Sequence, residues 1–162
     1  MIYAQGKRIL LRTPEVGDAG VYSPYYRAMK DPEILKYLEA RFVSWDEEEL
    51  KNYIRNPKGL LYAICLSDDI HIGNIKLTIN HLHKSAEVGL IIFKEYWGQS
   101  YGTEVLKLIT QYAFSTLGLH KLWAGCYAEN AAAIRAFERA DFRREGVHKS
   151  QYWLDNHYTD AL

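Results

Sequence analysis

Two glycines frame the junction between an apolar run and a helical pattern in the stretch "YWGQSYGTEV", residues 96–105. A helix N-terminus carries unpaired backbone N–H groups and the positive end of the helix dipole, which suits an anion such as a pyrophosphate. Glycine lets the backbone approach such a ligand closely. Gly98 and Gly102 therefore indicate a phosphate-binding loop, although an ordinary tight strand-to-helix connection would show the same pattern.

The loop matches neither of two common nucleotide-binding motifs. No Gly-Lys-Ser/Thr closes it as in a Walker loop, and its spacing is not the dinucleotide G-x-G-x-x-G. Other reactive side chains are weaker candidates. His81 and His83 alternate in a predicted hairpin without an acidic or thiol neighbour, so we expect no metal site. Ser100 and Ser115 have no histidine at a telling spacing, which disfavours a serine nucleophile.

The elements around this junction alternate between strand and helix patterns. Short apolar runs predict strands, and periodic apolar stripes behind capping signals predict helices. We expect strands over residues 8–12, 60–66, 70–79, 86–93 and 121–127. We expect helices over about 18–30, 31–38, 45–55 (begun by a Ser44–Glu47 capping box), 100–116 and 131–140, and a closing hairpin around Asp155-Asn156. Strands with helices packed beside them make an α+β sheet protein.

The composition limits the remaining classes of function. At 162 residues the chain is long enough for one domain with a sizeable core, so we expect a single domain over 1–162. Lys plus Arg equals Asp plus Glu at 20 each, which disfavours a nucleic-acid or membrane partner. Cys65 and Cys126 are too few for a disulfide scaffold, and the N-terminus lacks the apolar stretch of a signal peptide. We therefore expect a cytoplasmic protein.

Three segments occur in the order and spacing of a known family: "AEVGLIIF", "YWGQSYGTEVLKLITQYAF" and "LHKLWAGCYAENAAAIRAFERADF". Together they resemble the GCN5-related N-acetyltransferase (GNAT) superfamily, and in particular its RimJ/RimL-like branch. The resemblance covers at least residues 70–160. It implies a mixed, mostly antiparallel central sheet of about six to seven strands flanked by about four helices. It also implies acetyl-CoA as the co-substrate and no metal.

In that family a Q/R-x-x-G-x-G/A loop binds the acetyl-CoA pyrophosphate through backbone amides at the start of a helix. The implied cofactor-binding residues here are Gly98, Gln99, Ser100, Tyr101, Gly102 and Thr103. Two positions depart from the pattern: Trp97 stands in place of Gln or Arg, and Ser100 replaces the first motif glycine. Because serine tolerates helical dihedral angles and can donate to phosphate, we expect binding to survive.

The strand over 86–93 is implied to hold the other end of the co-substrate. By resemblance it splays from the 121–127 strand, and the pantetheine arm lies between the two. The arm would contact the backbone groups of Ile91, Ile92 and Phe93. A main-chain N–H in this region would polarise the thioester carbonyl, as an oxyanion donor does.

The same strand carries a candidate general base. Alternation puts Glu87, Gly89, Ile91 and Phe93 on one face. The attacking amine must lose a proton, and a positioned carboxylate can remove it. Glu87 is therefore either the catalytic base or a solvent-facing strand carboxylate.

The proton donor to the leaving thiolate stays open at this stage. Many family members use a tyrosine on the helix that follows an asparagine. Asn130 stands at the asparagine position, where it is implied to bind the pantetheine arm and can also cap the helix. Phe137 occupies the tyrosine position along the same cofactor-binding helix, and a phenyl ring donates no proton. Tyr127, Tyr101 or water takes this role, or the thiolate leaves unaided.

These features predict an acetyl-CoA-dependent N-acetyltransferase in which a neutral primary amine attacks the thioester directly. The acceptor is an amino sugar, another small amine or a protein N-terminus. The alternative is a non-catalytic acyl-CoA-binding sensor or interaction module, which Ser100 and Phe137 keep open. Family members usually continue the last strand further than Leu162, and a short edge strand is compatible with a monomer or a homodimer.

Overall fold

The computed structural model describes residues 1–162 and is built around a six-stranded sheet of order β1-β2-β3-β4-β5-β6. Its strands are β1 (Ile2–Gln5), β2 (Ile9–Arg12), β3 (Leu60–Leu66), β4 (His71–Asn80), β5 (Ser85–Ile92) and β6 (Lys121–Trp123). Neighbours are antiparallel except β5 and β6, which run parallel. A parallel pair needs a crossover, which contains α4 (Tyr101–Ser115). The expected mixed, mostly antiparallel α+β sheet is confirmed.

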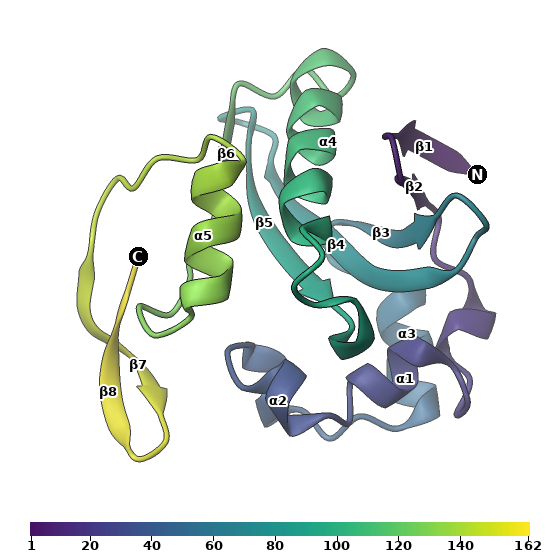
Figure 1. Ribbon diagram of the computed structural model, residues 1–162, viewed down its shortest axis with the longest axis horizontal. Coiled ribbons are helices and arrows are strands. Elements are labelled where there is room, and N and C mark those ends of the chain that lie inside the picture. Colours follow the sequence, from purple (N-terminus) through teal and green to yellow (C-terminus); the bar gives the residue numbers. More distant parts are fainter.

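Helices cover both faces of this sheet. Besides α4 they are α1 (Pro24–Ala28), α2 (Pro32–Leu35), α3 (Glu47–Arg55) and α5 (Ala131–Arg139), with 3₁₀ turns η1 (Val16–Ala19), η2 (Glu39–Phe42) and η3 (Lys94–Tyr96). Figure 1 shows α4 and α5 side by side, and α1 to α3 gathered in a separate group. Tyr62 and Ile64 of β3 enter the core under α4, whereas Leu61 enters the core under α1 to α3. Because alternate strand residues face opposite ways, the two groups lie on opposite faces.

The N-terminal helices are shorter than the sequence pattern predicts. The prediction of one helix over 18–30 is wrong, because the chain turns after η1 and a new helix begins at Ser23-Pro24. The Ser23 hydroxyl accepts the Tyr26 N–H at 3.0 Å, and proline fits the first helical position. The helix expected over 31–38 is only the single turn of α2, although Asp31 caps it as expected. Strand β1 is not predicted at all.

The Ser44–Glu47 capping box is also wrong. Asp46 is the N-cap of α3, and its carboxylate accepts the Glu49 N–H at 2.8 Å. Trp45 is buried, and its indole N–H donates to the Ala40 carbonyl at 2.8 Å. This anchor fixes the chain just before Asp46, so α3 begins two residues later than a cap at Ser44 would place it. No helix of the protein is long and apolar enough to cross a bilayer.

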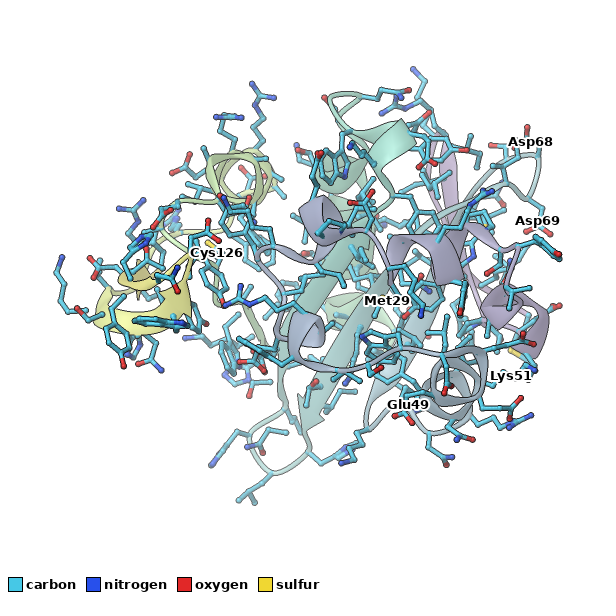
Figure 2. The ribbon with its side chains drawn as sticks, turned by 90° about the horizontal axis from the view of Figure 1, so that it is seen from below. Met29, Glu49, Lys51, Asp68, Asp69 and Cys126 are labelled. Carbon is cyan, nitrogen blue, oxygen red and sulfur yellow. The ribbon has the colours of Figure 1, made fainter.

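The closing hairpin is confirmed as β7 (His148–Leu154) and β8 (His157–Ala161), which form a separate two-stranded sheet. Asp155 and Asn156 both have positive φ (45° and 65°), as a tight two-residue hairpin turn requires. The hairpin joins the segment after β6, where Cys126 and Leu162 exchange backbone hydrogen bonds of 3.0 and 2.9 Å. Figure 2 shows Cys126 beside this hairpin, at the opposite end of the molecule from Asp68 and Asp69.

Candidate active site

The β5–β6 pairing stops after a few rungs. Glu87 and Trp123 form its last rung. Beyond it β5 stays paired with β4 as far as Ile92, whereas the chain after β6 turns to pair with β8 through Tyr127 and Ala161. The strands therefore diverge, as the resemblance implied. We call the opening between β5 beyond Glu87 and the chain beyond Trp123 the split. This divergence is why the strand expected over 121–127 ends at Trp123.

Two residues beyond the last rung, each side of this split carries a glycine. In the register of Glu87 and Trp123 these are Gly89 on β5 and Gly125 after β6. A Cβ atom on Gly89 would meet nothing within 4 Å, whereas one on Gly125 would lie 3.0 Å from the Tyr152 hydroxyl. The start of the split therefore has no side chain of its own on either edge.

The main chain of β5 presents alternate amides to the split. The Phe93 N–H donates to the Ile72 carbonyl of β4 at 2.9 Å. Because successive peptide groups of a strand point to opposite sides, the Ile92 and Leu90 amides point away from β4, toward the split. The Ile92 carbonyl on that side accepts the Trp97 indole N–H at 2.7 Å. The Trp97 indole thus caps the last carbonyl of β5.

Phe93 does not fit the role that the sequence suggested for it. Its N–H is bonded to β4 and its carbonyl accepts the Tyr96 N–H at 2.9 Å. Its ring is buried against Tyr25, with 6.1 Å between ring centroids. By the same alternation the Ile91 amide, like that of Phe93, points to β4 rather than to the split. We therefore remove Phe93 and Ile91 from the set whose backbone could contact the arm and keep Ile92, whose N–H faces the split.

The loop before α4 forms an anion-binding nest. Gly98 and Ser100 both have left-handed backbones, with φ of 73° and 65°. No acceptor within the protein receives the N–H groups of residues 99–103. Alternating backbone handedness together with a helix start gathers such donors around an anion. The loop thus offers the donors that a pyrophosphate requires.

Ser100 corrects one expectation about this loop. We expected serine to adopt helical dihedral angles, but it is the N-cap of α4 and has φ 65° and ψ 12°. A left-handed backbone costs a residue with a Cβ about 1 kcal/mol, and glycine avoids that cost. The left-handed backbone explains why glycine suits position 100. Serine adopts the same conformation there, but with backbone strain.

Arg8 anchors the nest and is a residue that the sequence did not reveal. Its Nε donates to Glu104 Oε2 at 2.7 Å and its Nη2 to the Gln99 carbonyl at 3.2 Å. Its guanidinium lies 4.5 Å from the centre of the Tyr101 ring. Tyr101 is thereby held under Arg8 at the base of the loop. Only the fold brings Arg8 here, because nothing in the local pattern links it to residues 99–104.

Helices α4 and α5 pack on each other beside the loop. A Cβ on Gly102 would lie 3.7 Å from the Ala136 Cβ and 3.9 Å from a Leu90 methyl group. Gly102 thus lies where α4, α5 and β5 meet. Asn130 is the N-cap of α5, as expected, with its Oδ1 accepting the Ala133 N–H at 3.1 Å. Phe137 packs edge-to-face on Phe142, 5.2 Å between centroids.

On the opposite face of the sheet, aromatic rings line the approach to the split. The buried Tyr127 lies between Tyr37 and Tyr152, with centroid distances of 5.6 and 4.2 Å. Tyr152 comes from β7, and sequence analysis missed it because its contacts depend on how the hairpin folds back. Arg41 covers the Tyr127 ring at 5.3 Å. Glu87 is exposed beside this group on β5.

Two pKa shifts show which charges meet here. Partial burial raises the pKa of the Tyr152 hydroxyl, and the carboxylates of Glu39 and Glu87 raise it further. Burial lowers the pKa of Lys76, and attraction to Glu87 opposes that shift. Glu39 of η2 and Glu87 of β5 therefore both raise the pKa of the Tyr152 hydroxyl.

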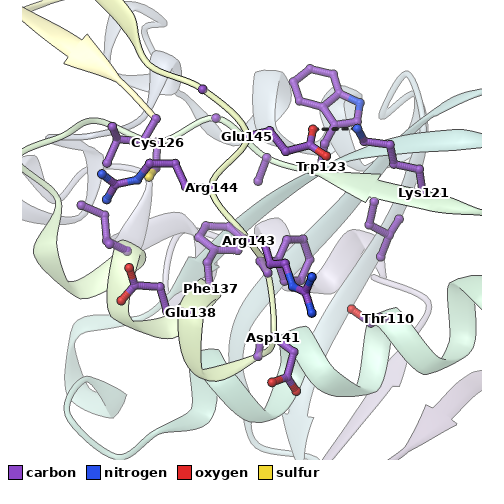
Figure 3. Close-up of a pocket in the computed structure, with 18 of the residues that line it drawn as sticks. Thr110, Lys121, Trp123, Cys126, Phe137, Glu138, Asp141, Arg143, Arg144 and Glu145 are labelled. Atoms are coloured by element: carbon purple, nitrogen blue, oxygen red, sulfur yellow. Dashed lines mark hydrogen bonds and ion pairs between the residues drawn. The ribbon is translucent and has the colours of Figure 1, made fainter.

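A large cavity borders the split. It measures about 1320 Å³, is bounded by α4, β6, α5 and the 141–148 segment, and has Gly125 and Tyr152 in its wall. Figure 3 shows Arg143 and Arg144 in its wall, with the Lys121–Glu145 ion pair of 2.6 Å. Of the predicted site residues only Phe137 lines it. No group of three or more His, Cys, Asp or Glu side chains gathers to hold a metal ion.

A family model described as an acetyltransferase (GNAT) domain matches residues 8–143. The chain belongs to the GNAT acetyltransferase family. It is an acetyl-CoA-dependent N-acetyltransferase, as the sequence motifs predict.

Relatives of known fold and name agree with the family. The uncharacterized N-acetyltransferase YnaD of Bacillus subtilis is 27% identical over 163 residues, which cover 96% of this chain and 94% of the relative. Spermidine N-acetyltransferase of Vibrio cholerae, solved with CoA and spermine, has a TM-score of 0.84 at 28% identity, covering 96% and 93% of the two chains. The ribosomal protein acetyltransferase RimL, solved with coenzyme A, shares the fold with a TM-score of 0.86 at 16% identity over 99% and 94%.

Proposed function

We propose that this GNAT chain acetylates the primary amine of a small cationic molecule, with a polyamine as the first candidate, and that Glu87 removes the amine proton. The observation that carries the proposal is the meeting of carboxylates and aromatic rings beside the split. Tyr152 stacks on Tyr127 with 4.2 Å between ring centroids, and burial together with the carboxylates of Glu39 and Glu87 raises the pKa of the Tyr152 hydroxyl. An ammonium group is attracted by carboxylates and by the faces of aromatic rings.

Glu87 has the right position for the base. It forms the last rung before the split and is exposed on the face opposite α4. An alkylamine has a pKa near ~10, so it arrives charged and must lose a proton before it attacks. A carboxylate at the edge of the split takes that proton directly or through one water molecule.

The co-substrate would enter from the other side of the same split. The N–H groups of residues 99–103 would hold the pyrophosphate, and Gly102 would leave room for the arm beside α5. The Asn130 side-chain amide and the Ile92 N–H would bind the arm, with Ile92 nearest the thioester carbonyl. Gly98 supplies the left-handed turn that opens the loop.

The choice of a polyamine draws on the spermidine N-acetyltransferase of similar fold, which was solved with spermine. An amino sugar or a protein N-terminus would need other partners, such as hydroxyl-binding side chains or an open peptide groove. The acidic and aromatic character of the approach favours the polyamine over both. A polyamine also carries further ammonium groups for the second carboxylate.

The test begins with calorimetry of acetyl-CoA binding, with dephospho-CoA as the comparison ligand. Release of free thiol is then followed with spermidine, glucosamine and a peptide with a free N-terminus, each at the same concentration. We expect micromolar binding of acetyl-CoA and saturable thiol release with spermidine. Turnover confined to glucosamine or to the peptide would overturn the proposed acceptor. Binding without any thiol release would favour a sensor role instead.

A further inference from the structure

The structure shows a hydroxyl group positioned over the start of the split. The Tyr152 oxygen lies 3.0 Å from the position that a Cβ on Gly125 would take. Its ring stacks on Tyr127 at a centroid distance of 4.2 Å and an interplanar angle of 23°. Gly125 and Tyr127 are two residues apart in the segment after β6, so the Tyr152 side chain contacts this segment at Tyr127 with its ring and reaches Gly125 with its hydroxyl.

Gly125 is what allows this arrangement. A contact of 3.0 Å between a Cβ and the phenolic oxygen is shorter than ordinary van der Waals contact. Any other residue would push the hydroxyl away from the backbone. A Cβ on Gly89, two residues beyond Glu87 on β5, would meet nothing within 4 Å. The Tyr152 hydroxyl thus lies two residues beyond Trp123, the partner of Glu87 in the last rung of the β5–β6 pair.

We propose that the Tyr152 hydroxyl donates the proton that the sulfur of coenzyme A takes up as it leaves. This inference rests on the proposed function, because the sulfur reaches Gly125 only if the arm lies in the split. It answers the question that Phe137 raises, since α5 offers only a phenyl ring packed on Phe142.

The proton and electron balance of the step is complete. The amine nitrogen forms a bond to the acetyl carbon, and the bond from that carbon to sulfur breaks with its electron pair on sulfur. Tyr152 gives its phenolic proton to the sulfur. The ammonium loses two protons in all. Glu87 takes one before the attack and the other from the nitrogen once its bond to the acetyl carbon has formed, and passes each to solvent. Tyr152 regains a proton from solvent, so both side chains return to their starting states.

The other hydroxyl candidates fit this role less well. Tyr101 lies under Arg8 at the base of the nest, 4.5 Å from the guanidinium. Tyr127 is buried beneath Tyr152 and covered by Arg41. Tyr127 therefore acts as a positioning residue, because its ring supports that of Tyr152.

The surroundings keep Tyr152 in its donating form. Burial, followed by the carboxylates of Glu39 and Glu87, raises the pKa of the hydroxyl above that of a free tyrosine. The phenol is therefore protonated at neutral pH. Its half-buried position leaves an edge open to solvent, from which the proton can be replaced.

The experiment compares Tyr152→Phe with wild-type protein, and uses Tyr158→Phe as the matched control. Tyr158 is an exposed tyrosine of β8, 66% accessible, on the same hairpin. Calorimetry gives the acetyl-CoA affinity, and the ultraviolet absorbance of the thiolate gives the pKa of the thiol in bound coenzyme A. A hydroxyl that donates to sulfur stabilises the thiolate. We therefore expect Tyr152→Phe to raise that thiol pKa by about one unit, with affinity unchanged.

Each outcome decides between the two proposals. Failure of wild-type protein to bind acetyl-CoA would refute the proposed site. Intact binding with the same thiol pKa in wild type and Tyr152→Phe would refute the role of Tyr152 alone. If Tyr152→Phe does not fold, Gly125→Ala replaces it, because the added methyl group displaces the hydroxyl and should raise the thiol pKa in the same direction. An unchanged thiol pKa in Gly125→Ala would then overturn the inference.

Discussion

The guanidinium of Arg8 and the ring of Tyr101 lie 4.5 Å apart, so the start of β2 is fixed to the first residue of α4. The same guanidinium donates to the Gln99 carbonyl and to Glu104. The shape of the nest therefore depends on a side chain far away in the sequence.

Arg8→Ala should weaken acetyl-CoA binding about tenfold, since a hydrogen bond from a charged group contributes about 1.5 kcal/mol or more. Calorimetry measures the dissociation constant. Arg55→Ala is the control, because Arg55 is exposed at the end of α3 and bonds only to Asn52. Equal affinities in the two variants would show that Arg8 does not shape the nest.

Ser100→Gly should raise the melting temperature by about 3 °C, because it removes about 1 kcal/mol of left-handed strain from a chain of this size. Ser100→Ala keeps the Cβ and the strain while removing the hydroxyl. Differential scanning calorimetry of both variants separates backbone from side chain. A melting temperature that rises equally in Ser100→Ala would contradict the strain argument.

Gly102→Val should reduce acetyl-CoA affinity at least a hundredfold, because a branched side chain would fill the junction of α4, α5 and β5. Gly102→Ala is the matched control, since its single methyl group meets Ala136 and Leu90 only at ordinary contact distances of 3.7 and 3.9 Å. Circular dichroism confirms that both variants are folded. Normal affinity in a folded Gly102→Val protein would show that acetyl-CoA does not bind beside Gly102.

Glu87→Gln should lower kcat about a hundredfold at neutral pH, the usual scale for a general base. The loss should shrink as the pH approaches ~10, because a growing fraction of the amine is then already neutral. The pH–rate profile with the best acceptor is the measurement. Glu49→Gln, an exposed glutamate of α3, is the control. An unchanged profile would remove Glu87 from the mechanism.

Asp18→Asn should destabilise the fold by about 3 kcal/mol, because it leaves the buried side of Arg12 without its partner charge. Arg12 donates to both Asp18 oxygens at 2.9 and 3.0 Å. Burial favours a higher pKa for Asp18, but the His71 ring, whose Nδ1 lies 3.4 Å from Asp18 Oδ1, and the hydrogen bonds from Arg12 outweigh it and hold that pKa well below its usual range. Urea denaturation at several pH values measures the loss.

The sign of this pH dependence follows from the lowered pKa of Asp18. The stabilisation is fully present above the unfolded pKa, near ~4, and declines as the pH falls below it toward the folded value. Asp18→Asn should therefore lose most stability at neutral pH and approach the wild type in acid. Asp68→Asn, at an exposed turn without an ion pair, is the control. A constant difference from neutral to acid pH would contradict the linkage.

Sequence patterns predicted strands β2 to β6, α4, α5 and the closing hairpin but not β1, because each predicted element depends on local periodicity and turn residues such as Asp155-Asn156. They predicted the nest through Gly98 and Gly102, whose freedom is also a local property. They failed where tertiary contacts determine the start of a helix or the partner of a backbone amide. The Trp45 anchor moves the start of α3, and the bonds of Phe93 to β4 remove it from the split.

The residues that sequence analysis missed share one cause. Arg8 reaches the site from just before β2 and Tyr152 from β7, and no spacing along the chain marks either side chain. Glu87 could be proposed because strand alternation alone fixes its face. Gly125 carried a faint signal, as a glycine within an apparent strand, which often marks a close approach.

The short ladder between β5 and β6 also affects the order of folding. Strands β3, β4 and β5 pair with their neighbours in sequence, so little chain entropy is lost when these hairpins close. The parallel rungs at Lys121–Trp123 close only after α4 has crossed over. We expect the meander to be the folding nucleus, with β6 docking late and its amides exchanging with solvent well before those of β4.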